Sequence, residues 1–143
     1  GNHILLGIHH QQPQLEKYPL HVASMKGAID IANDLLNKKK AHINDENDEG
    51  MTPLYVACVA ENLPMIHFLL QNNADVNKKN KDGLTPLFIP CIRGLFNILE
   101  ILLQNHANVR VSSNSMKTPI WFALLNKRFN IIRRLLEFEP NLV

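Results

Sequence analysis

Residues 50–83 read GMTPLYVACVAENLPMIHFLLQNNADVNKKNKDG, and the rest of the chain repeats this pattern. The stretch opens with Thr52-Pro53-Leu54, reaches Leu69-Leu70 and closes with Ala74-Asp75-Val76-Asn77. The opening tripeptide has three further counterparts in the chain, which are Tyr18-Pro19-Leu20, Thr85-Pro86-Leu87 and Thr118-Pro119-Ile120. The prolines of the four copies stand 34, 33 and 33 residues apart. A fixed period of this length indicates a stacked array of repeats.

The residues of each repeat predict two short helices. Thr52 suits a helix N-cap because its hydroxyl accepts from a free backbone N–H, and Pro53 suits the first helical position. A second helix with one apolar face is predicted between Asn62 and Asn72, followed by Asn73, since asparagine tolerates the left-handed conformation of helix ends. One such helix pair cannot bury its own apolar face, whereas stacked pairs can.

These residues resemble the ankyrin-repeat pattern, in which a turn with Gly precedes T-P-L-H-x-A, a second helix ending in L-L, and G-A-D-V-N. The resemblance covers residues 13 to 143 and implies an all-α solenoid of stacked helix pairs joined by β-hairpin-like loops. It divides the chain into a flank at residues 1–16 and a repeat domain at 17–143. The repeats fall at about 17–50, 51–83, 84–116 and 117–143.

The copies depart from the family pattern at three kinds of position. The His of the motif survives as His21 and is replaced by Tyr55, Phe88 and Trp121. The turn Gly is present as Gly50 and Gly83 and is replaced by Glu16 and Met116. The Gly that closes the second helix is replaced by Lys39 or Lys40, Asn73, His106 and Glu139.

Pro90 stands inside the first helix of the third repeat, with Thr85 as the expected N-cap. Because Pro90 lacks an N–H and disfavours helix before it, we expect a kink or a tightened turn. Tolerated drift and a reshaped groove are both open as its cause. The predicted core centres on Leu69, Leu70, Leu102 and Leu103, with Ala57 and Cys58 at close helix contacts, and helix content is expected well above half.

Composition indicates a globular protein, and the motif search indicates no catalytic activity. The 143 residues are 45% hydrophobic and 20% charged, and the net charge of +2 is too small to favour nucleic acid or an anionic membrane as the main partner. No phosphate-binding glycine loop, HExxH or GxSxG motif occurs, so we expect no enzyme, cofactor or metal. Cys58 and Cys91 are expected to be free, buried and inert, which suits a reducing compartment. We expect an intracellular location, in the cytoplasm rather than the nucleus.

The ends of the chain leave alternatives open. Residues 1–16 read either as the tail of a preceding repeat or as a local cap. Charge at Asp34 and Arg134 fits end-capping of a four-repeat array. By contrast, residues 141–143 read as the start of another connecting loop, which favours a segment of a larger protein.

In the ankyrin family the loop tips and the exposed side of each first helix line a groove. The resemblance assigns the loop positions Lys17, Asp48, Glu49, Met51, Lys81, Asp82, Leu84 and Lys117. It assigns the helix positions Met25, Lys26, Val59, Ala60, Ile92, Arg93, Leu125 and Asn126. Met25, Val59, Ile92 and Leu125 share one register and predict an apolar ridge, with Met51 and Leu84 as exposed apolar tips beside it. An apolar strip with a charged rim is typical of partner sites, although the ridge can equally extend the core.

Three functions follow from this interpretation. The first is a monomeric module that binds a partner protein or peptide through the groove. The second is a targeting or regulatory segment of a larger enzyme or effector. The third, implied by the resemblance, is a substrate for asparaginyl hydroxylation at Asn77 or, less well matched, Asn44.

Overall fold

The computed structural model describes residues 17–143, and the regular structure among them is entirely helical. This confirms the predicted all-α class. The chain divides into two compact units, one up to Asp75 and one from Val76. The predicted helix content was too high, because loops and turns take up nearly half of the described residues. The two interpretations of residues 1–16 concern a segment outside the described range.

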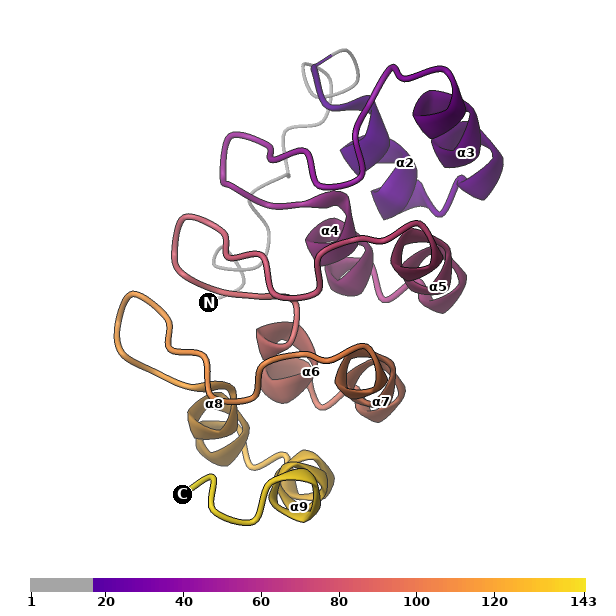
Figure 1. The fold of residues 1–143 in the computed structure, drawn as a ribbon. Coiled ribbons are helices and arrows are strands. Elements are labelled where there is room, and N and C mark those ends of the chain that lie inside the picture. Colours follow the sequence, from indigo (N-terminus) through magenta and orange to yellow (C-terminus); the bar gives the residue numbers. More distant parts are fainter. Residues whose placement is uncertain (1–16) are drawn as a thin grey trace. The chain divides into compact units, whose positions relative to one another are not determined.

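Within its described residues, the first unit has two helix pairs, which are α2 (Pro19–Lys26) with α3 (Ile29–Asn37), and α4 (Pro53–Val59) with α5 (Leu63–Gln71). α2 packs against both α3 and α4, and α4 packs against α5 (Figure 1). The first helices of the two repeats therefore contact each other within this unit.

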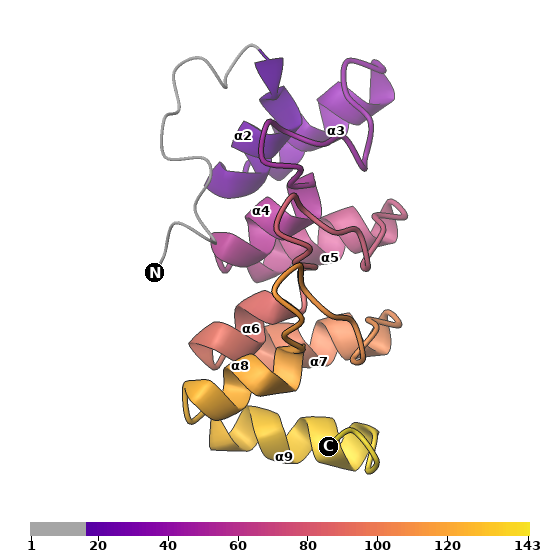
Figure 2. The same cartoon turned by 90° about the vertical axis from the view of Figure 1, so that its left-hand side faces the viewer.

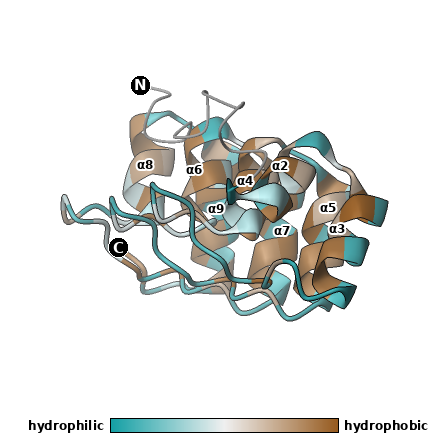
Figure 3. Cartoon of the chain, turned by 90° about the horizontal axis from the view of Figure 1, so that it is seen from above, coloured by the Kyte–Doolittle hydropathy of each residue, from teal (hydrophilic) through white to brown (hydrophobic). Residues whose placement is uncertain are grey.

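The second unit repeats this arrangement. Its pairs are α6 (Phe88–Arg93) with α7 (Phe96–Gln104), and α8 (Pro119–Leu125) with α9 (Phe129–Phe138). α6 packs against α8 and α7 against α9, and Figure 2 shows these helices in successive layers of the unit. Seen from above in Figure 3, hydrophilic residues predominate along the connecting loops, whereas α8 is largely hydrophobic.

A threonine caps the first helix, as predicted, in the second and fourth repeats, at Thr52 and Thr118. The Thr52 hydroxyl accepts from the backbone N–H of Tyr55 at 3.2 Å, and Pro53 is the first residue of α4. The Asn62 side chain caps α5 in the same way, accepting from Met65 N at 2.9 Å. Asn73 has a φ of 68°, so this asparagine takes the left-handed conformation that was predicted. Lys39, with a φ of 56°, is the residue that takes this place in the first repeat.

α6 begins two residues later than its counterparts. The N–H groups of Phe88 and Ile89 donate to the oxygens of Thr85 and Pro86 at 3.1 Å each, which is the tighter i to i+3 pattern. This is the tightened turn expected from Pro90. Thr85 is not the N-cap that the sequence indicated, because α6 begins at Phe88 with Leu87 before it.

The core is formed by inward-facing leucines and small residues. Leu69 and Leu102 are fully buried and Leu103 nearly so, whereas Leu70 is only half-buried, which corrects its predicted central place. Cys58 and Cys91 are completely buried, as expected, and burial raises the pKa of both thiols far above its usual value. Neither thiol is therefore a nucleophile in the folded protein.

Candidate partner-binding surface

Two asparagines set the shape of the connecting loops. The Asn47 Oδ1 atom accepts from the backbone N–H groups of Glu49 at 3.0 Å and Met51 at 2.9 Å. Asn80 repeats this arrangement with Asp82 at 2.9 Å and Leu84 at 3.0 Å. The loops are thus held by buried side chains rather than by the turn sequence alone.

The turn glycines Gly50 and Gly83 were recognised from the sequence, but the loop-forming role of these asparagines was missed. A signal was present, because an asparagine stands three residues before each turn glycine, at 47 and at 80. Ser113 takes the same place in the last loop, where its hydroxyl accepts from Lys117 N at 3.2 Å. The position therefore selects a short side chain that carries an acceptor oxygen.

In the first unit the loop tip is joined to the start of α2. The Tyr18 hydroxyl donates to Asp48 Oδ1 at 2.5 Å, and Lys17 Nζ lies 3.3 Å from the same oxygen. The hydrogen bond to Asp48 raises the pKa of Tyr18 and also that of Lys17. Glu49 beside them is exposed. This tip presents a negative edge that Lys17 partly offsets.

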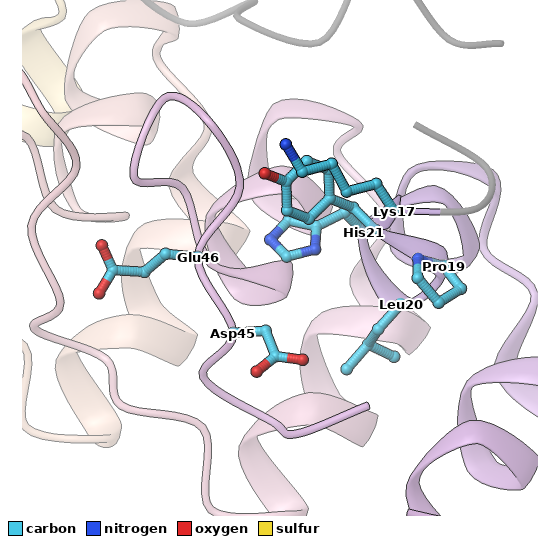
Figure 4. Close-up of a pocket in the computed structure, with 7 residues that line it drawn as sticks. Lys17, Pro19, Leu20, His21, Asp45 and Glu46 are labelled. Carbon is cyan, nitrogen blue, oxygen red and sulfur yellow. The ribbon is translucent and has the colours of Figure 1, made fainter. Parts of the chain in front are cut away.

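A shallow pocket opens beside this tip. Figure 4 shows Lys17, Pro19, Leu20 and His21 on one side of it and Asp45 and Glu46 on the facing loop. His21 is buried, and its Nε2 atom lies 2.7 Å from the Met51 carbonyl oxygen. Burial lowers the His21 pKa, so the ring is neutral at pH 7 and links α2 to the loop that precedes α4.

In the second unit two successive loops are hydrogen-bonded to each other. Asn114 donates from its backbone N–H to the oxygen of Asp82 at 3.0 Å and from Nδ2 to that of Lys81 at 2.7 Å. Lys79 Nζ donates to the Ser112 oxygen at 3.3 Å. The exposed side chains of Lys81 and Asp82 therefore stand on a braced loop pair.

The apolar tips predicted at Met51 and Leu84 do not exist. Both side chains are 2% exposed, because the backbone that Asn47 and Asn80 hold turns these residues inward. Val59 is also buried, at 7%, so the ridge is interrupted there. These three residues belong to the core.

The other predicted positions lie at or near the surface. Met25, Ile92, Arg93 and Lys117 are half-buried, as is Ala60. The exposed positions are Lys17, Lys26, Asp48, Glu49, Lys81, Asp82, Leu125 and Asn126. Each unit therefore offers a set of charged loop tips together with a smaller apolar area on its first helices.

The two asparagines considered for hydroxylation both make hydrogen bonds between loops. Asn77 Oδ1 accepts from Asn108 N at 2.7 Å, and its Nδ2 donates to the His106 oxygen at 3.1 Å. Asn44 Oδ1 accepts from Asp75 N at 2.8 Å. Both side chains thus have a structural role, and modification of either stays a hypothesis.

Residues 17–143 contain no group of three or more His, Cys, Asp or Glu side chains placed to hold a metal ion. Among the same residues, no helix has the length and apolar character needed to cross a membrane.

Comparison with known proteins agrees with this architecture. The family model described as Ankyrin repeats (3 copies) matches residues 3–80 and 73–143. Alpha-latrocrustotoxin-Lt1a of Latrodectus tredecimguttatus is 34% identical over 53 residues, which is 37% of this chain and 4% of the toxin. The 26S proteasome non-ATPase regulatory subunit 10 of Dictyostelium discoideum is 39% identical over 56 residues, which is 39% of this chain and 24% of that subunit. The matched region therefore spans less than a quarter of either relative.

Proposed function

The chain belongs to the ankyrin-repeat family, and on this premise we propose that it binds a segment of a partner protein against its loop tips and first helices. Repeats of this family are general protein-interaction modules. The observation that most supports the proposal is the bracing of the loops by Asn47, Asn80 and Asn114. A braced loop loses little conformational entropy on binding, so more of the contact energy appears as affinity.

The proposed contact set is the predicted one without its buried members. It comprises Met25, Lys26, Asp48, Glu49, Lys81, Asp82, Ile92, Arg93, Lys117, Leu125 and Asn126. We propose that the chain acts as a monomer and that its contribution is binding, with no catalysis and no cofactor. An intracellular, cytoplasmic location fits its two buried thiols.

A photo-cross-linking experiment tests this surface without knowing the partner. A photoreactive phenylalanine analogue is placed at Glu49 or Asp82 on the loop tips, and in matched controls at His67 or Gln104 on the second helices. All four positions are exposed. In a cell extract the tip positions should give cross-linked proteins that an excess of unmodified protein competes away. Competed cross-links from His67 and Gln104, with none from the tips, would refute the assigned face.

The alternative function is that of a targeting or regulatory segment within a larger enzyme or effector. The comparison with the toxin favours it, since a related 53-residue stretch there accounts for only 4% of that protein. The length of the full gene separates the two functions. An open reading frame that encodes little beyond these repeats would exclude the alternative.

A further inference from the structure

The connection that follows α3 is one residue longer than the connection that follows α5. The last turn of α3 closes at Lys40 as that of α5 closes at Ala74, through equivalent backbone hydrogen bonds of 2.9 and 3.0 Å. Asn44 and Asn77 are the next equivalent pair, since each Oδ1 atom accepts the backbone N–H of an equivalent residue in the next repeat. Three residues separate the first pair of positions and two separate the second. The extra residue therefore lies within residues 41–43.

This longer connection makes a turn of its own beside a cavity. The backbone N–H of His42 donates to Asp45 Oδ2 at 2.9 Å, and Asp45 N donates to the His42 oxygen at 3.1 Å. The turn, the end of α3 and Asn72 at the end of α5 line a cavity of about 480 Å³ that opens to solvent. We name it the α3–α5 cavity. Its size falls within the range of small-ligand sites, which is roughly 300–1,000 Å³.

The α3–α5 cavity lies between the first and second repeats, and residues of both form its walls. It therefore does not depend on what precedes or follows these two repeats in the chain. Figure 2 shows α3 and α5 in successive layers of the first unit. Figure 1 shows them on the side of that unit away from the projecting loop before α4. The cavity is thus a separate site from the proposed surface of loop tips and first helices.

The lining of the cavity combines an apolar part with a polar rim. Leu36 and Ile43 are half-buried and Ala41 is buried, so the apolar side chains lie deeper. The polar side chains are exposed and belong to Asn37, Lys39, His42 and Asn72. A few polar groups around an apolar surface can fix the orientation of a ligand that has both characters.

The charge at the rim is positive. No carboxylate is among the described residues that line the cavity. The side chains of Lys39 and His42 make no hydrogen bond or ion pair with another residue in the range 17–143. Lys38 and Lys40 flank them, whereas the α3 terminus contributes only about half a negative charge from its dipole. The rim therefore attracts an anion.

We propose that the α3–α5 cavity binds the free C-terminal end of a partner polypeptide whose last residue is apolar. The α-carboxylate pairs with Lys39, with His42 beside it, and the last side chain covers Leu36 and Ile43. The Asn72 Nδ2 atom already donates to the Phe68 oxygen at 2.8 Å, which leaves its Oδ1 atom to accept a backbone N–H of the peptide.

The chemistry of the lining favours a chain end over other anions. A C-terminal residue carries its carboxylate and its apolar side chain on one carbon atom, so both reach the cavity together. An internal Asp or Glu has no apolar group at that distance, and a phosphate would leave the apolar part of the lining uncovered. Capture of a C-terminal carboxylate is also a recurring mode of peptide recognition.

The test begins with selection from a library of short random peptides that end in a free carboxylate, using the whole chain. Each enriched peptide is selected again on Asn72→Phe, and those that still bind are set aside. Phenylalanine fills the cavity, and Phe138 has this place in the last repeat. The matched control is Asn105→Phe, the same change one repeat later. We expect the remainder to bind the control variant and to end in apolar residues. Polar ends, or no peptide that depends on Asn72, overturn the proposal.

The affinity of an enriched peptide is then measured by fluorescence anisotropy, as the free acid and as the C-terminal amide. Amidation removes the charge and keeps every side chain, so it should weaken binding roughly tenfold or more. Lys39→Asn should weaken it similarly and still fold, because Asn73 has the same left-handed conformation at this place in the second repeat. Lys38→Asn changes an exposed lysine outside the lining and should weaken binding less than about twofold. Equal affinity of acid and amide, or equal losses at Lys38 and Lys39, overturns the proposal.

Two further ligands are an amidated peptide with an internal phosphoserine and inorganic phosphate alone. Tighter binding of either than of the free-acid peptide overturns the assignment to a chain end. Glu49→Lys and Asp82→Lys on the loop tips should leave the free-acid peptide bound. If these changes release it and Asn72→Phe does not, the cavity is the wrong site and the proposed function stands. Binding at the cavity without competed cross-links from the tips would refute the proposed function instead.

Discussion

The backbone N–H of Phe88 donates to the main-chain oxygen of Thr85 at 3.1 Å, and the Thr85 hydroxyl beside it is buried without a partner. At the equivalent place before α4, the hydroxyl of Thr52 accepts a hydrogen bond from the backbone N–H of Tyr55. Pro90 accounts for the difference, because the shortened α6 leaves the first turn in the tighter hydrogen-bond pattern. Two identical Thr-Pro-Leu sequences thus place their threonines in different roles.

The first prediction follows from this contrast. Thr52→Val removes a working helix cap and should lower the free energy of unfolding by about 0.5–2 kcal/mol. Thr85→Val removes a buried hydroxyl that has no partner, so it should be neutral or stabilising. Urea unfolding of both variants measures the difference. Equal losses at the two positions would mean that the Thr85 hydroxyl caps α6 after all.

The 33-residue period predicted the helix pairs, and proline is the first residue of α2, α4 and α8 because its effect on the helix start is local. The direction in which a loop side chain points, by contrast, is not determined by its immediate neighbours in the sequence. Whether Met51 faces solvent depends on Asn47 holding two backbone N–H groups across the turn. Helical periodicity does not reveal such a contact, so Met51 and Leu84 were wrongly predicted to be exposed.

The second prediction is the consequence of that correction. Met51→Asp or Leu84→Asp places a charge where the native side chain is 2% exposed, which destabilises a domain by several kcal/mol or unfolds it. Asp82→Asn, on the exposed tip of the same loop as Leu84, should change the free energy of unfolding by less than about 0.5 kcal/mol. Thermal unfolding followed by circular dichroism measures all three. An unchanged melting temperature for Met51→Asp would contradict the burial of Met51 and support the original prediction that it is an exposed loop tip.

The third prediction concerns pH and His21. Burial holds the pKa of His21 below its usual value, outweighing the raising effects of the Met51 carbonyl and Asp45. The unfolded chain therefore binds a proton more readily than the folded protein. Stability from the neutral ring is present above the usual histidine pKa and is lost as pH falls through the folded pKa.

The melting temperature should accordingly fall between pH 7.5 and pH 5, and the fall should be smaller in His21→Tyr. Tyrosine is the residue that the second repeat has at this place, as Tyr55, so it provides a side chain already accommodated by this fold. The two proteins differ only at residue 21, so the difference between their pH profiles reports on His21 and its immediate surroundings. Parallel profiles would show that His21 does not contribute to the pH dependence.

The last prediction compares two residues at the same place in successive loops. Gly83 and Met116 have φ values of 79° and 64°, and each donates its N–H to the residue three before it, Asn80 at 3.0 Å and Ser113 at 2.9 Å. A Cβ on Gly83 would lie 2.7 Å from the backbone nitrogen of Asn114. Met116 holds the same backbone conformation with a side chain that is 79% exposed. The conformation is strained for methionine and unstrained for glycine.

Gly83→Ala should therefore destabilise the protein by about 1–3 kcal/mol, through the left-handed backbone and the contact with Asn114. Met116→Gly should stabilise it by on the order of 0.5 kcal/mol, because relief of the strained φ exceeds the extra entropy that glycine loses on folding. Urea unfolding measures both, and Met116→Ala serves as the control because it removes the side chain but keeps the Cβ. If Met116→Ala stabilised the protein as much as Met116→Gly, the gain would come from loss of an exposed apolar side chain rather than from relief of the backbone.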